Sequence, residues 1–167
     1  KSVTLAGREL QLDERKRNVV IAVLPGVMLT ALHSAMLDLP KTDLIDALHT
    51  DHYRIQWIIG SYILGSATGM GTTGFWGARL GMYRSYFGAL ALFALASGLC
   101  GLVTDVLSMT PLRLVAGYGT GLVISTAMVL FWREFPDNKE RAMALYGIGL
   151  FLTAVFGSAL GGLLTYF

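Results

Sequence analysis

Charge is scarce in this chain, and it is almost absent from five long apolar stretches. Acidic and basic residues make up 14% of the 167 residues, whereas a soluble domain usually carries about 25%. The stretches are residues 19–39, 55–74, 86–103, 111–132 and 142–167, and the charged residues inside them are Asp38 and Arg113. A helix of about 20 residues crosses the hydrocarbon layer of a bilayer. A soluble domain of this length cannot bury five such segments in one core, so the sequence predicts an all-α membrane protein, a bundle of transmembrane helices.

Cysteine is also scarce, since Cys100 is the one cysteine of the chain. This excludes a disulfide framework and a cysteine-based metal site. The first apolar stretch ends in Asp38, Leu39 and Pro40 rather than in the small residues of a signal cleavage site, so we expect a retained helix. Because the chain starts at Lys1 and stops within an apolar run, we expect a portion of a longer protein.

Lysine and arginine are unevenly distributed around the apolar stretches. Ten of them precede the first stretch or lie in the second and fourth connections, whereas Lys41 and Arg54 lie in the first. The positive-inside rule then predicts a cytoplasmic N-terminus and an outer loop at residues 40–54. We therefore expect a cytoplasmic segment at residues 1–18 and transmembrane helices one to five at residues 19–167, in a plasma (inner) membrane.

Small residues recur every four positions in two of the stretches. These residues are Ser61, Gly65, Gly69 and Thr73 in the second stretch, and Gly149, Thr153, Gly157 and Gly161 in the fifth. Such stripes let two helix backbones approach closely. The glycine-rich run at residues 117–121 invites comparison with a nucleotide-binding loop, but it lies inside an apolar stretch and follows no strand, so we expect close packing there too. Pro25 predicts a kink in the first helix.

The second connection carries a motif that points to a family. Residues 74–84 read GFWGARLGMYR, which resembles the signature of the major facilitator superfamily between its second and third helices. The matching positions are Gly74, Arg79, Gly81 and Arg84, and the resemblance implies that they form an inner gate. Ala78 stands where the family has an aspartate of a charge relay, and Tyr83 replaces an arginine.

Three further strings extend the resemblance. Residues 113–119, RLVAGYG, are similar to the family's fourth-helix motif. Residues 149–162 resemble the fifth-helix motif of drug:proton antiporters, with Ser158 where the family has proline and with Gly149, Gly157, Gly161 and Gly162 in place. Residues 30–40, TALHSAMLDLP, resemble the first helix of the fourteen-helix branch with different polar positions. The resemblance covers residues 18–167 and implies most of one transporter half, the N-terminal portion.

Three polar residues are candidates for proton coupling. Arg113 is a cation within an apolar span, which usually faces a cavity or a partner, and the family implies a coupling role; alternatively, it snorkels to the outer surface. Asp38 is a candidate proton carrier that Arg113 would tune, or a solvated carboxylate at a helix end. His33 titrates near neutral pH and suits a relay; alternatively, it is a neutral histidine hydrogen-bonded to a backbone carbonyl, or it lines the substrate path passively.

Trp57, Tyr62 and Met36 are candidates to line a path for an amphipathic substrate, although aromatic residues of this kind mostly pack or lie at the membrane interface. His49, Asp51 and His52 have the chemistry of metal ligands, but their spacing matches no metal-binding pattern. We therefore expect no metal and no cofactor.

The resemblance implies a secondary active transporter, which exports hydrophobic or amphipathic small molecules in exchange for protons by alternating access. Its expected partners are the small molecule, protons, the lipid bilayer and a missing second transporter half, with no nucleic acid. We expect no enzyme activity, because nothing resembles a nucleophile with its base. The alternative is a transport-inactive scaffold, assembly partner or sensor with the same fold.

Overall fold

The computed structural model describes residues 18–34, 52–103, 105–135, 140, 143–144, 146–153 and 155. These form the N-terminal helix Asn18–Ser34, α3 at His52–Leu80, α4 at Met82–Cys100, α5 at Val106–Glu134, and a last helical segment within residues 140–155. The described residues contain helices and short connections and no strand. The predicted all-α fold is therefore confirmed.

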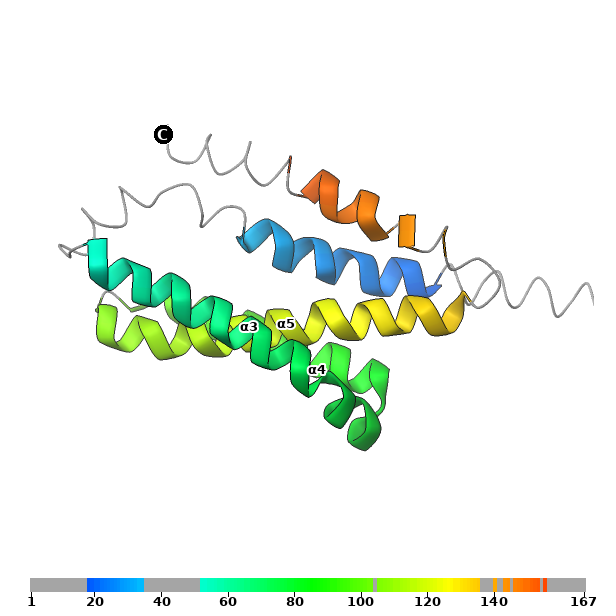
Figure 1. The fold of residues 1–167 in the computed structure, drawn as a ribbon, viewed down its shortest axis with the longest axis horizontal. Helices are drawn as coiled ribbons and strands as arrows, with labels where there is room; N and C mark the ends of the chain where they lie inside the picture. The colour runs from blue at the N-terminus through cyan, green and yellow to red at the C-terminus, as the bar shows by residue number, and fades with distance from the viewer. Residues whose placement is uncertain are drawn as a thin grey trace, which may run out of the picture.

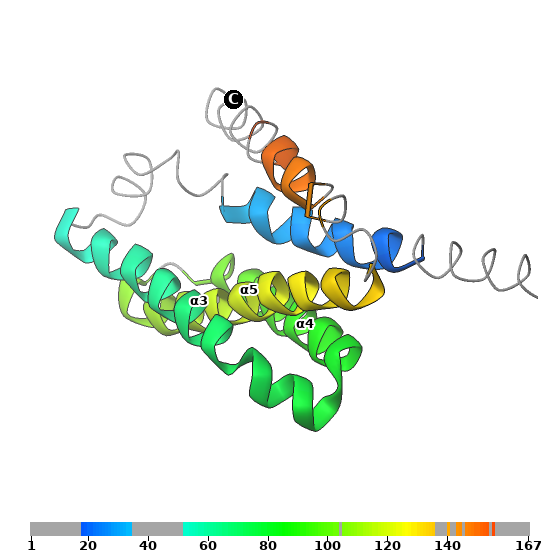
Figure 2. The ribbon, with the colours of Figure 1, turned by 45° about the vertical axis from the view of Figure 1, so that its right-hand side comes forward.

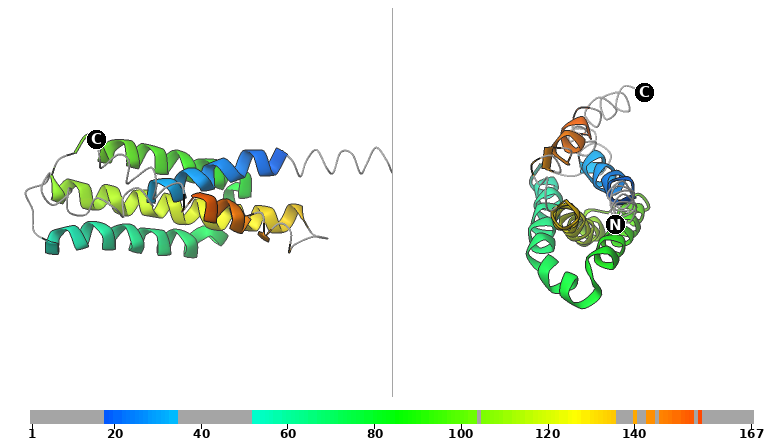
Figure 3. Two further views of the ribbon diagram at one scale, coloured as in Figure 1. Left: turned by 90° about the horizontal axis from the view of Figure 1, so that it is seen from above. Right: turned by 90° about the vertical axis from the view of Figure 1, so that its right-hand side faces the viewer.

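The helices pack as a bundle with α5 in its interior (Figure 1). Seen end-on, α5 is flanked by α3 and α4, and the N-terminal helix and the last segment cover a further side (Figure 3). The same order is visible after a rotation of the whole molecule (Figure 2). Helix α5 packs extensively against both α3 and α4, whereas α3 and α4 make few contacts with each other. The fourth apolar stretch is thus the central element.

Several helix bounds differ from those that hydropathy predicts. Helix α5 begins at Val106, five residues before the apolar stretch that starts at Pro111. Pro111 is the sixth residue of α5 and lies inside the helix, where it removes the backbone hydrogen bond that a residue at this position would donate to the Leu107 carbonyl, but the helix continues through it. Helix α3 continues beyond the apolar stretch to Leu80. Gly81 then turns the chain into α4 with φ 84 and ψ 150, a conformation that is essentially restricted to glycine.

Glycines bring α3 and α5 into backbone contact. A Cβ atom added at any of four glycines would collide with backbone atoms of the facing helix; these are Gly65 and Gly69 on α3, and Gly117 and Gly121 on α5. Close approach of this kind lets helices associate by van der Waals packing. The predicted role of the small residues in the second stretch and of the run at 117–121 is therefore confirmed for these four positions.

Hydroxyl groups add polar links to the same interface. Thr73 Oγ1 lies 2.5 Å from Ser125 Oγ, and Ser61 Oγ donates to the Thr110 carbonyl at 3.2 Å. The Tyr118 hydroxyl lies 2.8 Å from Thr72 Oγ1 and accepts a hydrogen bond from the Trp76 indole at 2.7 Å.

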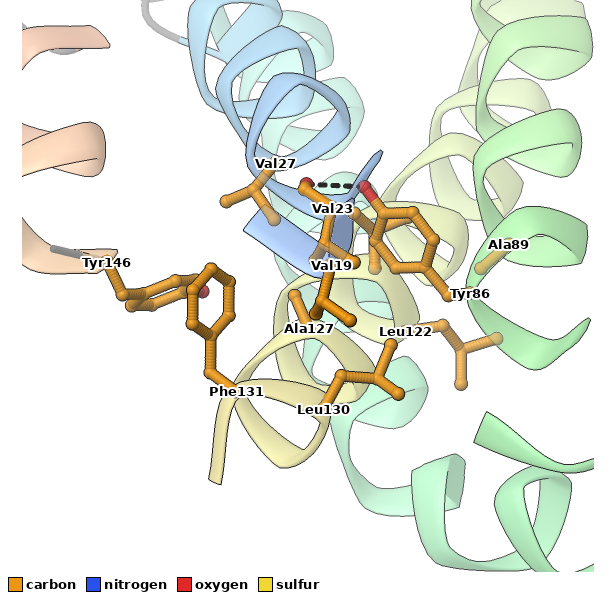
Figure 4. Close-up of a cluster of buried hydrophobic side chains, with 11 residues drawn as sticks. Val19, Val23, Val27, Tyr86, Ala89, Leu122, Ala127, Leu130, Phe131 and Tyr146 are labelled. Carbon is orange, nitrogen blue, oxygen red and sulfur yellow. Dashed lines mark hydrogen bonds between the residues drawn. The ribbon is translucent and has the colours of Figure 1, made fainter. Parts of the chain in front are cut away.

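A buried cluster fixes the N-terminal helix on α4 and α5 (Figure 4). Its members are Val19, Val23, Val27, Tyr86, Ala89, Leu122, Val123, Ala127, Leu130, Phe131 and Tyr146. The Tyr86 hydroxyl donates to the Val23 carbonyl at 2.7 Å, in a space that a Cβ atom at Gly26 would fill. Tyr146 packs on Phe131 with ring centroids 5.8 Å apart, so the last helical segment rests on α5.

Among the described helices, Leu107–Glu134 is long and apolar enough to span a membrane, with a mean hydropathy of 1.8. The N-terminal helix, Asn18–Ser34, is apolar but shorter. Helix α3 is long enough, but it carries many glycine, serine and threonine residues, which lower its hydropathy.

Candidate functional site

Arg113 lies inside the bundle. Its side chain is 8% exposed, about two turns into α5. The buried thiol of Cys100, the last residue of α4, is close enough to the guanidinium to interact with it electrostatically. The Nε atom is buried and has no hydrogen-bond partner in the described part of the chain. The side chain therefore points into the bundle rather than to its outer surface, which is the orientation that a cation in an apolar span usually takes.

His33 lies near Arg113, close to the end of the N-terminal helix. Ser97 Oγ of α4 lies 3.0 Å from its Nε2 and 3.3 Å from its Nδ1. The ring also meets Phe93 edge-on, with centroids 5.2 Å apart. The positive charge of Arg113 acts electrostatically on the imidazole. Two of the three proton-coupling candidates are thus brought together.

The Tyr62 side chain links three helices through hydrogen bonds. Its hydroxyl lies 2.7 Å from Ser34 Oγ of the N-terminal helix and donates to Thr120 Oγ1 of α5 at 3.0 Å. Thr120 in turn donates to the Ala116 carbonyl at 3.1 Å. The Tyr62 hydroxyl therefore already has two protein partners.

Trp57 lies elsewhere. Its side chain is 61% exposed and borders a groove of about 780 Å³ between α3 and the start of α5, lined by Arg54, Trp57, Asp105, Leu107, Thr110, Pro111 and Leu114. Residues five apart on a helix differ in direction by about 140°. The structure therefore does not bring Trp57 and Tyr62 to one surface.

The predicted inner-gate residues gather around the turn between α3 and α4. Arg79 lies over the Phe75 ring at 4.5 Å, and a Cβ atom at Gly74 would meet nothing within 4 Å. Arg84 borders a hollow of about 320 Å³ together with Gly81 and Arg133. The Tyr83 hydroxyl donates to Glu134 Oε1 at 3.2 Å, so Tyr83, which replaces the family's arginine, links this turn to the end of α5.

Other predicted residues lie outside the described residues. These are Asp38, Met36, His49, Asp51, Gly157, Ser158, Gly161 and Gly162, and for His52 the backbone alone is described. Gly149 is described and buried, and a Cβ atom there would contact Leu24 at 3.3 Å. Among the described residues, no group of histidine, cysteine, aspartate and glutamate is arranged to hold a metal ion.

Sequence reasoning missed the residues of α4. Phe93 and Ser97 contact His33, and neither belongs to a family motif. Their spacing of four residues places them on one helix face. This spacing, in a helix that neighbours the helix carrying Arg113, is the sequence signal that could have identified these residues.

Comparisons with known proteins identify the family. The family model described as Major Facilitator Superfamily matches residues 20–167. The chain is 33% identical over 109 residues to a multidrug resistance protein B homolog of Mycobacterium tuberculosis, which covers 65% of this chain and 20% of that protein. It is 26% identical over 153 residues to the drug efflux pump JefA of the same species, which covers 90% and 30%.

The tetracenomycin C resistance and export protein of Streptomyces glaucescens is 29% identical over 146 residues, covering 87% of this chain and 27% of that protein. This chain therefore spans between 20% and 30% of the length of these three relatives. No solved structure matches the chain. The family model covers almost the whole chain, and its members are membrane transporters rather than enzymes; the chain belongs to the Major Facilitator Superfamily.

Proposed function

We propose that this chain forms part of a secondary active transporter that exports hydrophobic or amphipathic small molecules in exchange for protons. The observation that carries the proposal is the buried Arg113 beside His33. A charged group inside a membrane bundle is costly, and such groups mark ion and substrate pathways. The relatives that are named as efflux, export and multidrug resistance proteins support this choice of activity.

In this proposal the coupling residues are Arg113, His33 and Asp38. Protonation of His33 or Asp38 biases which side of the membrane the substrate path faces, and substrate competes for that state. Arg113 tunes the proton affinity of its neighbours through its fixed positive charge. Rocking of this half against a second half exposes the site to each side in turn.

The remaining proposed roles follow the same scheme. Tyr62 and Met36 line the substrate path, whereas Trp57, which borders a groove on another surface, is left out of it. Because the Tyr62 hydroxyl has two protein partners, its ring is the part that meets substrate. Gly74, Arg79, Gly81 and Arg84 form the inner gate. The fifth helix provides close, flexible contact through Gly149, Gly157, Ser158, Gly161 and Gly162.

The test is transport by the complete protein in liposomes, with ethidium as the amphipathic probe and an imposed pH gradient. We expect Arg113→Ala to slow gradient-driven flux by about tenfold or more, because it removes a buried charged donor. Arg113→Lys keeps the charge and should retain part of the flux. Arg17→Ala, which removes a cation outside the apolar stretches, controls for the loss of a positive charge in general.

The outcomes separate the hypotheses. Unchanged flux in Arg113→Ala removes this residue from the mechanism. Flux of ethidium that does not change when the pH gradient is removed refutes proton coupling. A well-folded protein that moves neither ethidium nor other amphipathic dyes favours the transport-inactive scaffold, assembly partner or sensor.

A further inference from the structure

The groove of about 780 Å³ between α3 and the start of α5 has no role in the proposed transport. Both helices begin at this end of the bundle, α3 at His52 and α5 at Val106 (Figure 1 and Figure 3). The chain belongs to a family of membrane transporters, and the ends of membrane helices lie at the level of the lipid headgroups. The groove therefore stands where a headgroup meets its acyl chains.

Aromatic and apolar side chains border the groove. Trp57 and Leu107 are 61% and 82% exposed, and Leu114 lies about two turns further along α5 than Leu107. Tyr53, about one turn before Trp57, meets the indole edge-on with ring centroids 6.4 Å apart. Exposed tryptophan and tyrosine residues are typical of the membrane interface. These side chains offer apolar contacts that run from the helix ends toward the interior of the bilayer.

Among the described residues that border the groove, one is a cation and one is an anion, Arg54 and Asp105. Arg54 lies in the first turn of α3, which contains no acidic residue. Asp105 is the N-cap residue of α5, but its carboxylate makes no capping hydrogen bond, although aspartate at such a position usually does. Both side chains are exposed. The charges of the groove are thus complementary to a ligand that carries one negative and one positive group.

We propose that this groove binds the headgroup of a phosphatidylethanolamine lipid. The Arg54 guanidinium donates N–H groups to the phosphate, which it can bind in a bidentate way, and the start of α3 adds partial positive charge. The primary ammonium group of the lipid donates to the Asp105 carboxylate, and the acyl chains lie along Leu107 and Leu114. A phosphatidylglycerol headgroup has no cation for Asp105, and a choline group has no N–H to donate. This inference goes beyond the proposed transport and does not depend on it.

The experiment titrates dioleoyl phosphatidylethanolamine into the complete protein, delipidated in dodecyl maltoside, and follows the melting temperature. A ligand that binds the folded state raises the melting temperature in a saturable way. Dioleoyl phosphatidylcholine and dioleoyl phosphatidylglycerol should need about ten times more lipid for the same rise, because each lacks one charge-assisted hydrogen bond.

Two variants test the two charged groups separately. Arg54→Gln should raise the half-saturating concentration of phosphatidylethanolamine about tenfold or more. Arg133→Gln is the matched control, because Arg133 is also exposed but lies in the last turn of α5, at its other end. Asp105→Asn removes the charge and keeps a good N-cap residue, so it should abolish the preference for phosphatidylethanolamine over phosphatidylcholine.

A further arm identifies the source of the headgroup. Soluble glycerophosphoethanolamine should not raise the melting temperature at the concentrations at which the lipid does, because it lacks the acyl chains. A full rise with this compound would overturn a membrane lipid as the occupant.

Three other outcomes would overturn the lipid site. The first is an equal half-saturating concentration in wild type and Arg54→Gln, and the second is an unchanged lipid preference in Asp105→Asn. The third is the absence of any lipid-dependent rise, together with a lower melting temperature of Trp57→Ala in lipid-free detergent, which would assign the groove to contacts with another part of the transporter. Because no flux is measured, failure here leaves the proposed transport standing, and a transport-inactive protein can still bind the lipid.

Discussion

The contact between α3 and α5 makes a quantitative prediction about two glycines on one helix. A Cβ atom at Gly69 would collide with the backbone of Tyr118, whereas a Cβ atom at Gly71 would meet nothing within 4 Å. The substitution to alanine is chemically the same at both positions, and both lie within α3. Any difference between the two variants therefore reports the packing of α3 on α5.

The two substitutions should change the free energy of unfolding in opposite directions. In Gly71→Ala the exposed helix gains propensity worth up to about 1 kcal/mol. In Gly69→Ala the colliding atoms belong to backbone, which cannot rotate away as a side chain can, so the helices must separate. Overpacking of this kind typically costs about 1–3 kcal/mol. The gain in helix propensity is common to both substitutions, so the two variants should differ by the overpacking cost, roughly 1–3 kcal/mol in the free energy of unfolding.

The assay is the melting temperature of the complete protein in detergent, read from the loss of the monodisperse peak after heating. About 1 kcal/mol corresponds to about 2–4 °C in a domain of 150–250 residues, so Gly69→Ala should melt at least about 2 °C below Gly71→Ala. Gly65→Ala should behave like Gly69→Ala. Equal melting temperatures for Gly69→Ala and Gly71→Ala would refute the close backbone approach of the two helices.

Three further changes test other parts of the bundle. Gly81→Ala should lower the free energy of unfolding by about 1–3 kcal/mol, because the backbone conformation of Gly81 is nearly restricted to glycine. Gly74 has open space around it, so Gly74→Ala should leave the free energy of unfolding unchanged. Equal losses of melting temperature in the two variants would contradict this prediction. Tyr86→Phe should cost about 1–2 kcal/mol in the same melting assay, since it removes the hydroxyl that donates to the Val23 carbonyl. Tyr62→Phe should lower the melting temperature by a similar amount through the loss of its two hydroxyl contacts; unaltered stability would show that this junction contributes nothing.

The sequence determined the fold class and the family. Five apolar stretches of about a bilayer's thickness predict helices, because hydropathy averaged over a window reports length and composition. The helices of the described residues and the family match over residues 20–167 agree with that prediction. The glycine spacing likewise predicts close packing before any partner helix is known, since four-residue spacing alone places small residues on one face.

Tertiary structure decided which residues meet. The apolar stretch that starts at Pro111 did not fix the start of α5 at Val106, because residues 106–110 join the helix through backbone hydrogen bonds. Hydropathy also could not pair His33 with Ser97, or the Tyr62 hydroxyl with Ser34 and Thr120. Such contacts depend on how each helix is rotated about its axis and crosses its neighbours, and those angles are fixed by the packing of side chains along the whole interface rather than by any one segment.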